Sequence, residues 1–374
     1  MGKMTNTGGA ARSGAAQGTT ENGTAQGRTK QGGSEQGGKL RIARILVPVS
    51  VFFFWYSHYV YMPILPDYVR ERTQNLTQVG VVLAMYGLWQ VIVRLPIGIL
   101  TDRLGRRKPF ILLGIILSGV GAVTIGFAAT YPQLVIGRSL IGLSMWAWVL
   151  QVVFFGGLFD KEMLIKAGSV LTLSSSFAKL AGTFSAGLMA SRLGSIFVFL
   201  TAAAASIVAA LLMAPVREPV REAGGTAWSR LKVVLKSSKV WTVSLLGAVN
   251  QFLNFGITFG FFPIIAATMG ADDSMKGYLL STNILFLIAG NLFVTYKGQR
   301  KNAFLIAAAG YLFFTVSVIG TPLSPGLAPL FLLQALLGLA HGLTYPVLIG
   351  LCIEDIPDDA RASAMGFHQS VYAI

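Results

Sequence analysis

The sequence predicts an all-α integral membrane protein made of two parallel six-helix bundles, and three observations support this. Of its 374 residues 53% are hydrophobic and only 12% are charged, with a mean hydropathy of +0.64, which is too apolar for a soluble chain. Apolar runs recur at the length of about 20 residues that a helix needs to cross a hydrocarbon core of about 30 Å. Motifs of the first half of the chain also return in the second half.

The apolar runs give the predicted spans, which lie at 45–68, 78–100, 109–129, 133–158, 167–190, 195–215, 240–268, 276–296, 302–321 and 327–352. A further run begins near Ala362 and continues to Ile374, so we expect a fold truncated within the eleventh helix. Gly, Ser, Thr, Gln and Ala dominate the first 38 residues, which cannot bury a core. The predicted domains are a disordered cytoplasmic tail (1–38), an N-terminal bundle (39–215), a basic cytoplasmic linker (216–239) and an incomplete C-terminal bundle (240–374).

Basic residues crowd alternate connections between the spans, which predicts the orientation of the chain. The crowded connections hold Lys39, Arg41, Arg44; Arg103, Arg106, Arg107, Lys108; Lys161, Lys166; Arg217, Arg221, Arg230, Lys232, Lys236, Lys239; and Lys297, Arg300, Lys301. By the positive-inside rule, the amino terminus is cytoplasmic. The net charge of +15 therefore reflects topology, and no nucleic-acid partner is expected.

The internal repeat relates four pairs of short motifs at separations of 193 to 200 residues. The pairs are Pro63-Ile64-Leu65-Pro66 with Pro263-Ile264-Ile265, Gly105-Arg106-Arg107-Lys108 with Gly298-Gln299-Arg300-Lys301, Arg138…Gly142-Leu143 with Gln334…Gly338-Leu339, and Lys166-Ala167-Gly168-Ser169 with Arg361-Ala362-Ser363-Ala364. One shared register favours two similar halves, an arrangement that places a substrate site near the bilayer midplane between them.

A charged, glycine-bearing turn joins the second and third spans. Gly98 and Gly105 permit close helix approach and a tight turn, and Asp102 can accept from open N–H groups at a neighbouring helix start. The residues Gly98, Leu100, Asp102, Arg103, Gly105, Arg106 and Arg107 match the loop motif G-x-L-a-D-r-x-G-r-r/k of the major facilitator superfamily, and Arg138 with Gly142 match its helix-four motif. The chain therefore resembles that family, and by pattern its drug:proton antiporter subgroup, although 174–182 lacks the subgroup's Gly-Pro signature.

The resemblance implies a gating role for the loop motif. It implies that Asp102 faces the start of the eleventh helix and that Arg106 pairs with a carboxylate at the end of helix four, for which Asp160 is the candidate. Such a cluster would hold the two halves in one state and release them in another. The alternative is a basic loop that only sets topology.

Polar residues inside the spans indicate which helices face a central cavity. The third, sixth and ninth spans carry neither charges nor side-chain amides within the hydrocarbon region and should face lipid. The substrate-cavity candidates are Arg138, Lys179, Trp55, Tyr59, His58, Trp146, Asn250, Asn254, Gln334, His341 and Tyr345. Since an intramembrane cation is costly, Arg94, Arg138 and Lys179 are functional candidates by default, and an electropositive cavity favours an anionic substrate. Alternatively, Arg138 serves packing and Lys179 snorkels; the two histidines serve hydrogen bonding or a proton relay, not metal binding.

The predicted function is secondary active transport by alternating access of a small anionic or amphipathic organic solute across the plasma membrane, with efflux favoured. The resemblance implies proton coupling, for which Asp67, His58, His341 and Lys179 are the titrating candidates. We expect a monomer without cofactor or metal, and no enzyme, since no loop holds a nucleophile elbow, a metal-ligand cluster or a phosphate-cradling loop. The alternatives are a transporter-like sensor or a lipid or glycolipid flippase, which would open to lipid between helices five and eight.

Overall fold

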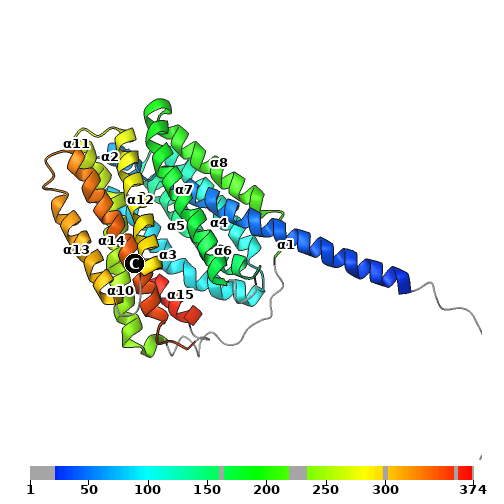
Figure 1. The fold of residues 1–374 in the computed structure, drawn as a ribbon. Helices are drawn as coiled ribbons and strands as arrows, with labels where there is room; N and C mark the ends of the chain where they lie inside the picture. The colour runs from blue at the N-terminus through cyan, green and yellow to red at the C-terminus, as the bar shows by residue number, and fades with distance from the viewer. Residues whose placement is uncertain (1–21, 160–163, 219–233, 298–301, 358–360, 373–374) are drawn as a thin grey trace, which may run out of the picture. The chain divides into compact units, whose positions relative to one another are not determined.

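The computed structural model describes residues 22–159, 164–218, 234–297, 302–357 and 361–372. The chain divides into two compact units, Met1–Ile42 and Ala43–Ile374, and the second holds all contacts discussed below. Over the described ranges the regular structure is helical throughout, as Figure 1 shows. This confirms the predicted all-α class.

The described residues of the first half form eight helices. They are α1 (Asn22–Tyr59), α2 (Leu65–Thr73), α3 (Leu76–Leu104), α4 (Lys108–Gly126), α5 (Tyr131–Ser144), α6 (Trp146–Gly156), α7 (Leu164–Leu193) and α8 (Ser195–Met213). The second half contains α10 (Ser238–Phe252), the π-helix η2 (Leu253–Phe261), α11 (Phe262–Thr268), α12 (Asp273–Lys297), α13 (Ala303–Gly320), α14 (Leu327–Ile353) and α15 (Arg361–Tyr372). Nine helical segments of the described chain are long and apolar enough to cross a membrane.

Helix α1 differs from the sequence prediction at its beginning. It starts at Asn22, within the segment 1–38 for which we expected a disordered tail; residues 1–21 lie outside the described part. A helix that is already nucleated in the apolar run from Leu40 gains one hydrogen bond for each residue that it adds, which explains how it continues back into a polar segment.

Three of the predicted spans are interrupted in the structure. The span 45–68 divides into α1 and α2 because Pro63 and Pro66 cannot donate backbone hydrogen bonds to a continuous helix. The span 133–158 breaks at Met145, between α5 and α6. The span 240–268 passes through the nine-residue π-helix η2, a geometry that is frequent at functional sites.

The loop motif forms a tight turn, as its glycine predicted. Gly105 ends α3 in the left-handed conformation with φ 62°, which a glycine adopts without strain. At the start of α4, the carboxylate of Glu218 accepts the backbone N–H of Arg107 and, at 3.4 Å, that of Lys108. A carboxylate at a helix N-terminus is stabilised by the helix dipole.

Equivalent contacts recur in the two halves at nearly the same separation as the sequence repeat. A Cβ at Gly142 of α5 would meet the carbonyl oxygens of Met85 and Tyr86 on α3 at 2.8 and 3.0 Å, and a Cβ at Gly338 of α14 would collide with the carbonyl oxygen of Asn283 on α12. Helix α5 therefore packs through a glycine on α3, and helix α14 packs in the same way on α12. The repeat thus extends from the motifs to helix packing.

Candidate functional site

A cavity of about 470 Å³ lies between the two halves, within the size range of small-molecule sites. Its wall is built from α1, α3, α6, α7, α10, η2, α12, α14 and α15, together with Met145 between α5 and α6. Among the described residues that line it, none comes from α4, α8 or α13, which are the third, sixth and ninth predicted spans. This is the arrangement that the uncharged character of those spans predicted.

The first half contributes a cation held between aromatic rings. The Lys179 Nζ of α7 lies 4.1 Å from the centre of the Trp55 ring and 5.2 Å from that of Tyr59. The Tyr59 ring in turn contacts Phe259 of η2 edge to face, with 5.5 Å between centroids. Cation–π contacts of this kind stabilise a desolvated ammonium without neutralising it. The cavity wall therefore keeps a positive charge.

A second cation of the cavity wall links α3 to α15. The guanidinium of Arg94 donates to the Gln90 Oε1 at 2.6 Å and to the backbone carbonyl of Gln369 at 3.3 Å. Gln90 itself donates to the carbonyl of Tyr86 one turn earlier, at 3.0 Å. These bonds fix the stripe Tyr86–Gln90–Arg94 that its four-residue spacing placed on one face.

The second half contributes neutral polar groups. The ring of His341 stacks on Tyr345 with 5.3 Å between centroids, and the Tyr345 hydroxyl lies 3.0 Å from that of Tyr372. Asn254 of η2 is nearly buried in the same wall. In the described part of the chain no carboxylate lines this cavity. Its lining is therefore electropositive and aromatic on one side and uncharged on the other.

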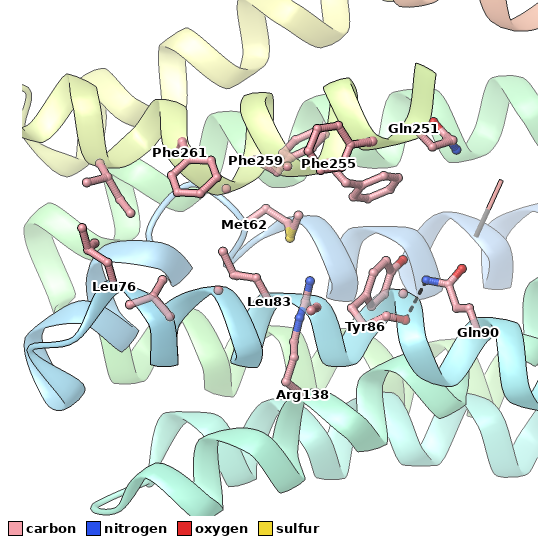
Figure 2. Close-up of a pocket in the computed structure, with 18 of the residues that line it drawn as sticks. Met62, Leu76, Leu83, Tyr86, Gln90, Arg138, Gln251, Phe255, Phe259 and Phe261 are labelled. Atoms are coloured by element: carbon pink, nitrogen blue, oxygen red, sulfur yellow. Dashed lines mark hydrogen bonds between the residues drawn. The ribbon is translucent and has the colours of Figure 1, made fainter. Parts of the chain in front are cut away.

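A smaller side cavity of about 350 Å³ lies between α3 and η2 (Figure 2). It shares Tyr86, Gln90, Gln251, Phe255, Phe259 and Tyr372 with the central cavity. Arg138 of α5 reaches it: its guanidinium carbon lies 4.4 Å from the centre of the Tyr86 ring, and its Nε has no hydrogen-bond partner within the described part of the chain. Most of the remaining wall is apolar. Arg138 is 3% exposed, so its charge is buried beside the central cavity rather than inside it.

The structure brings together six of the eleven predicted cavity residues in the central wall: Trp55, Tyr59, Lys179, Asn254, His341 and Tyr345. Four others lie behind the wall with partners or packing of their own. They are His58, bonded to the Ser144 Oγ at 3.0 Å and the Phe54 carbonyl at 2.8 Å; Trp146, bonded to the Phe110 carbonyl at 2.9 Å; Asn250, bonded to the Thr344 hydroxyl; and Gln334, fully buried.

The reason for this division is the rotation of each helix. The cavity touches only one narrow face of each helix, and a nearby residue that is rotated away from that face points into a helix interface instead. Trp146, for example, packs behind the wall, whereas Trp148 lines the cavity. Trp148 and Ile284 were missed because an apolar residue in an apolar span carries no signal of its own.

The gating residues are only partly within the described structure. Gly105, Arg106 and Arg107 are described, whereas the side chains of Asp102 and Arg103, the surroundings of Gly98, and Asp160 lie outside the described residues. The predicted pairing of Arg106 with Asp160 and the placement of Asp102 therefore stay predictions. Glu218, which caps α4 at this motif, was missed; its signal was an acidic residue directly after the sixth span, one of two in the basic linker.

Two packed helical halves around a central cavity define a multi-pass membrane transporter. The sequence profile of the Major Facilitator Superfamily matches residues 49–374, and the chain belongs to that family. The bacillibactin exporter of Bacillus subtilis (strain 168) is 26% identical over 330 residues, which are 83% of this chain and 81% of the relative. The class B tetracycline resistance protein of Escherichia coli is 36% identical over 86 residues, 22% of this chain and 21% of the relative.

Solved structures share the fold at low sequence identity. A bacterial homolog of the human lysosomal transporter Spinster gives a TM-score of 0.70 at 14% identity and covers 90% of this chain and 80% of its own. The D-xylose–proton symporter gives 0.69 at 17% identity and covers 89% and 87%. The chain is thus a transporter of this family rather than an enzyme, and exporters are among its relatives.

Proposed function

We propose that this transporter exports a small anionic or amphipathic organic solute across the plasma membrane by alternating access, coupled to protons. The position of Lys179 carries the proposal for the substrate class. It is a half-buried ammonium in the wall of the central cavity, flanked by the Trp55 and Tyr59 rings and without a carboxylate partner among the described residues. A solute anion supplies the missing negative charge, while the rings pack its apolar part.

Efflux is supported by the relatives rather than by the cavity. The bacillibactin exporter aligns along most of both chains, and the tetracycline resistance protein along a shorter segment. The tetracycline resistance protein is more alike in sequence over that segment, but the segment covers only 22% of this chain. The direction of transport is therefore a separate part of the proposal, which vesicles of either orientation test.

The substrate class is tested with the purified chain in liposomes, using two probes of similar size and opposite charge. We expect transport of salicylate, an aromatic anion, and none of ethidium, an aromatic cation. Lys179→Gln should raise the KM for salicylate about tenfold, equivalent to about 1.4 kcal/mol of lost binding. Arg192→Gln is the matched control, because Arg192 is an exposed cation in the last turn of the same helix.

Two results would contradict the substrate class. One is transport of ethidium without salicylate. The other is an unchanged KM for salicylate in the Lys179→Gln protein, because a snorkelling lysine that does not touch the solute leaves binding intact. A reversal of salicylate flux with the orientation of the vesicles fixes the direction.

Proton coupling is tested by imposing a pH gradient on the same liposomes. We expect flux of salicylate to increase when protons flow down the gradient in exchange for the solute. A salicylate flux that does not change with the pH gradient would contradict proton coupling but would leave the proposed substrate class unaffected. The cytoplasmic amino terminus is tested separately, by protease access to an epitope placed before Lys39 in intact cells.

A further inference from the structure

A buried ion pair joins the two halves at one end of the bundle. The Lys276 Nζ in the first turn of α12 lies 2.8 Å from the Asp67 Oδ2 in the first turn of α2, and 2.7 Å from the Asp273 Oδ1. The side chains of Lys276 and Asp67 are only 6% and 10% exposed. Arg70, at 3.7 Å from the second Asp67 oxygen, is 37% exposed and adds a weaker contact. Lys276 and Asp67 lie 209 residues apart, so no local helical contact explains their pairing.

The helices beside this pair are in close contact across the two halves. The hydroxyls of Thr183 on α7 and Ser281 on α12 lie 3.0 Å apart, and so do those of Ser191 and Ser274. A Cβ at Gly277 of α12 would meet the Thr183 carbonyl oxygen at 2.8 Å. A flippase was expected to open to lipid between the fifth and eighth spans, which are α7 and α12 in the structure. Over this stretch, the contacts between α7 and α12 close that seam.

The same two helices line the central cavity farther along the bundle. The lining residues of α7 lie between 168 and 179, and those of α12 lie between 284 and 291. The ion pair therefore lies at the closed end, beyond the cavity. By the positive-inside pattern, the connections at this end are those predicted to be outside the cell.

We propose that Asp67 and Lys276 form an ionic latch that holds the outer end closed and that must break before the cavity opens outward. This inference rests on the proposed alternating-access function. A charge pair suits such a role because its buried charges attract strongly while they touch, whereas water solvates both when the halves separate. When the outer end opens and Asp67 moves away from Lys276, Asp273 of the same helix still pairs with the Lys276 ammonium. Opening therefore does not leave an unpaired buried cation.

The latch is tested by a distance measurement that needs no substrate. Nitroxide labels on Thr77→Cys of α3 and Thr268→Cys of α11, in a Cys352→Ala background, report the separation of the halves at this end. In lipid nanodiscs we expect one short distance for the otherwise unchanged chain. Asp67→Asn and Lys276→Gln should each add a longer distance, and the double exchange Asp67→Lys with Lys276→Asp should restore part of the short population. Arg70→Gln is the control and should leave the distribution unchanged.

The outcomes separate this inference from the proposed function. A single short distance in both neutralised proteins overturns the latch, and so does an equal effect of Arg70→Gln. If Asp67→Asn does not fold, Lys276→Gln carries the same prediction, since Asp273 remains beside the new amide. A longer distance in a protein that transports neither probe supports the latch and contradicts only the substrate class.

Discussion

The two halves share a packing plan but differ in charge where they meet the cavities. Arg138 of α5 has its counterpart in Gln334 of α14, and Tyr86, under the Arg138 guanidinium, has its counterpart in Asn283 beside Gln334. Arg94 corresponds in the same register to Asn291. Since an uncharged glutamine fills the equivalent place in one half, the fold itself does not require a cation there. The charge of the first half is therefore not a consequence of the shared packing plan.

The largest expected effect comes from giving the second half the charge of the first. Gln334 is fully buried, and neither its Nε2 nor its Oε1 has a hydrogen-bond partner among the described residues. Gln334→Arg places an uncompensated cation among neutral groups, which should cost about 3–5 kcal/mol. We expect the protein to fail to accumulate in membranes, or to lose its cooperative thermal transition in detergent.

Gln334→Met is the matched control for that substitution. It keeps the volume and removes two unsatisfied polar atoms, so the thermal midpoint should stay unchanged or rise. A stable Gln334→Arg protein would show that the second half tolerates a cation as well as the first does, and the comparison between the halves would lose its functional meaning.

A medium effect is expected where the packing of the halves differs. Gly277 of α12 lies against α7, with Thr183 O at 2.8 Å and Gly187 N at 3.1 Å from the position of a Cβ. Its counterpart, Gly80 of α3, lines the side cavity, and a Cβ there would meet nothing within 4 Å. Gly277→Ala should destabilise by about 1–3 kcal/mol through overpacking. Gly80→Ala should instead be neutral or stabilise by up to about 1 kcal/mol through helix propensity.

Thermal unfolding in one detergent, followed by circular dichroism, compares the two alanine proteins. A loss of equal size in both would mean that the α3 face is packed as tightly as the α12 face, contrary to the side cavity. A loss in neither would mean that α7 and α12 adjust to a methyl group at no cost.

The sequence predicted the helices well because each signal was local and strong. Every predicted span corresponds to one helix or to two or three consecutive helical segments in the described structure, because the length of an apolar run is a strong local signal. It also singled out Lys179 as a candidate for the cavity, because a cation inside a membrane span is costly. That Lys179 lies against the Trp55 and Tyr59 rings was not predicted.

What the sequence could not predict depends on helix rotation and on long-range pairing. Whether His58 faces the cavity or bonds Ser144 depends on a rotation of tens of degrees, which a polar stripe does not resolve. The pairing of Asp67 with Lys276 joins residues from separate halves, and only the packed bundle brings them together. Charge patterning assigned both residues to the same side of the membrane but gave no partner.

The smallest expected effect is the difference in stability between two equivalent contacts, one at the start of each half. Arg44 of α1 donates to the Leu158 carbonyl at the end of helix four, at 3.1 and 2.8 Å, and packs 4.4 Å above the Phe159 ring. Lys239 of α10, its counterpart, pairs with Glu354 and Asp355 at the end of helix ten, at 2.6 Å each. The Lys239 and Asp355 side chains are 36% and 58% exposed, so water and salt screen this pair.

Arg44→Gln should therefore cost about 1.5 kcal/mol, close to the value of a partly buried charge-assisted hydrogen bond, and Lys239→Gln about 0.5 kcal/mol or less. The sharper readout is ionic strength. Raising NaCl to about 1 M shortens the screening length to about 3 Å, so the thermal shift of Lys239→Gln should vanish while that of Arg44→Gln persists, because its acceptor is a carbonyl and its stacking partner a ring. Equal salt sensitivity of the two shifts would show that both contacts act as simple ion pairs, and that the repeat conserves charge attraction here rather than a helix cap.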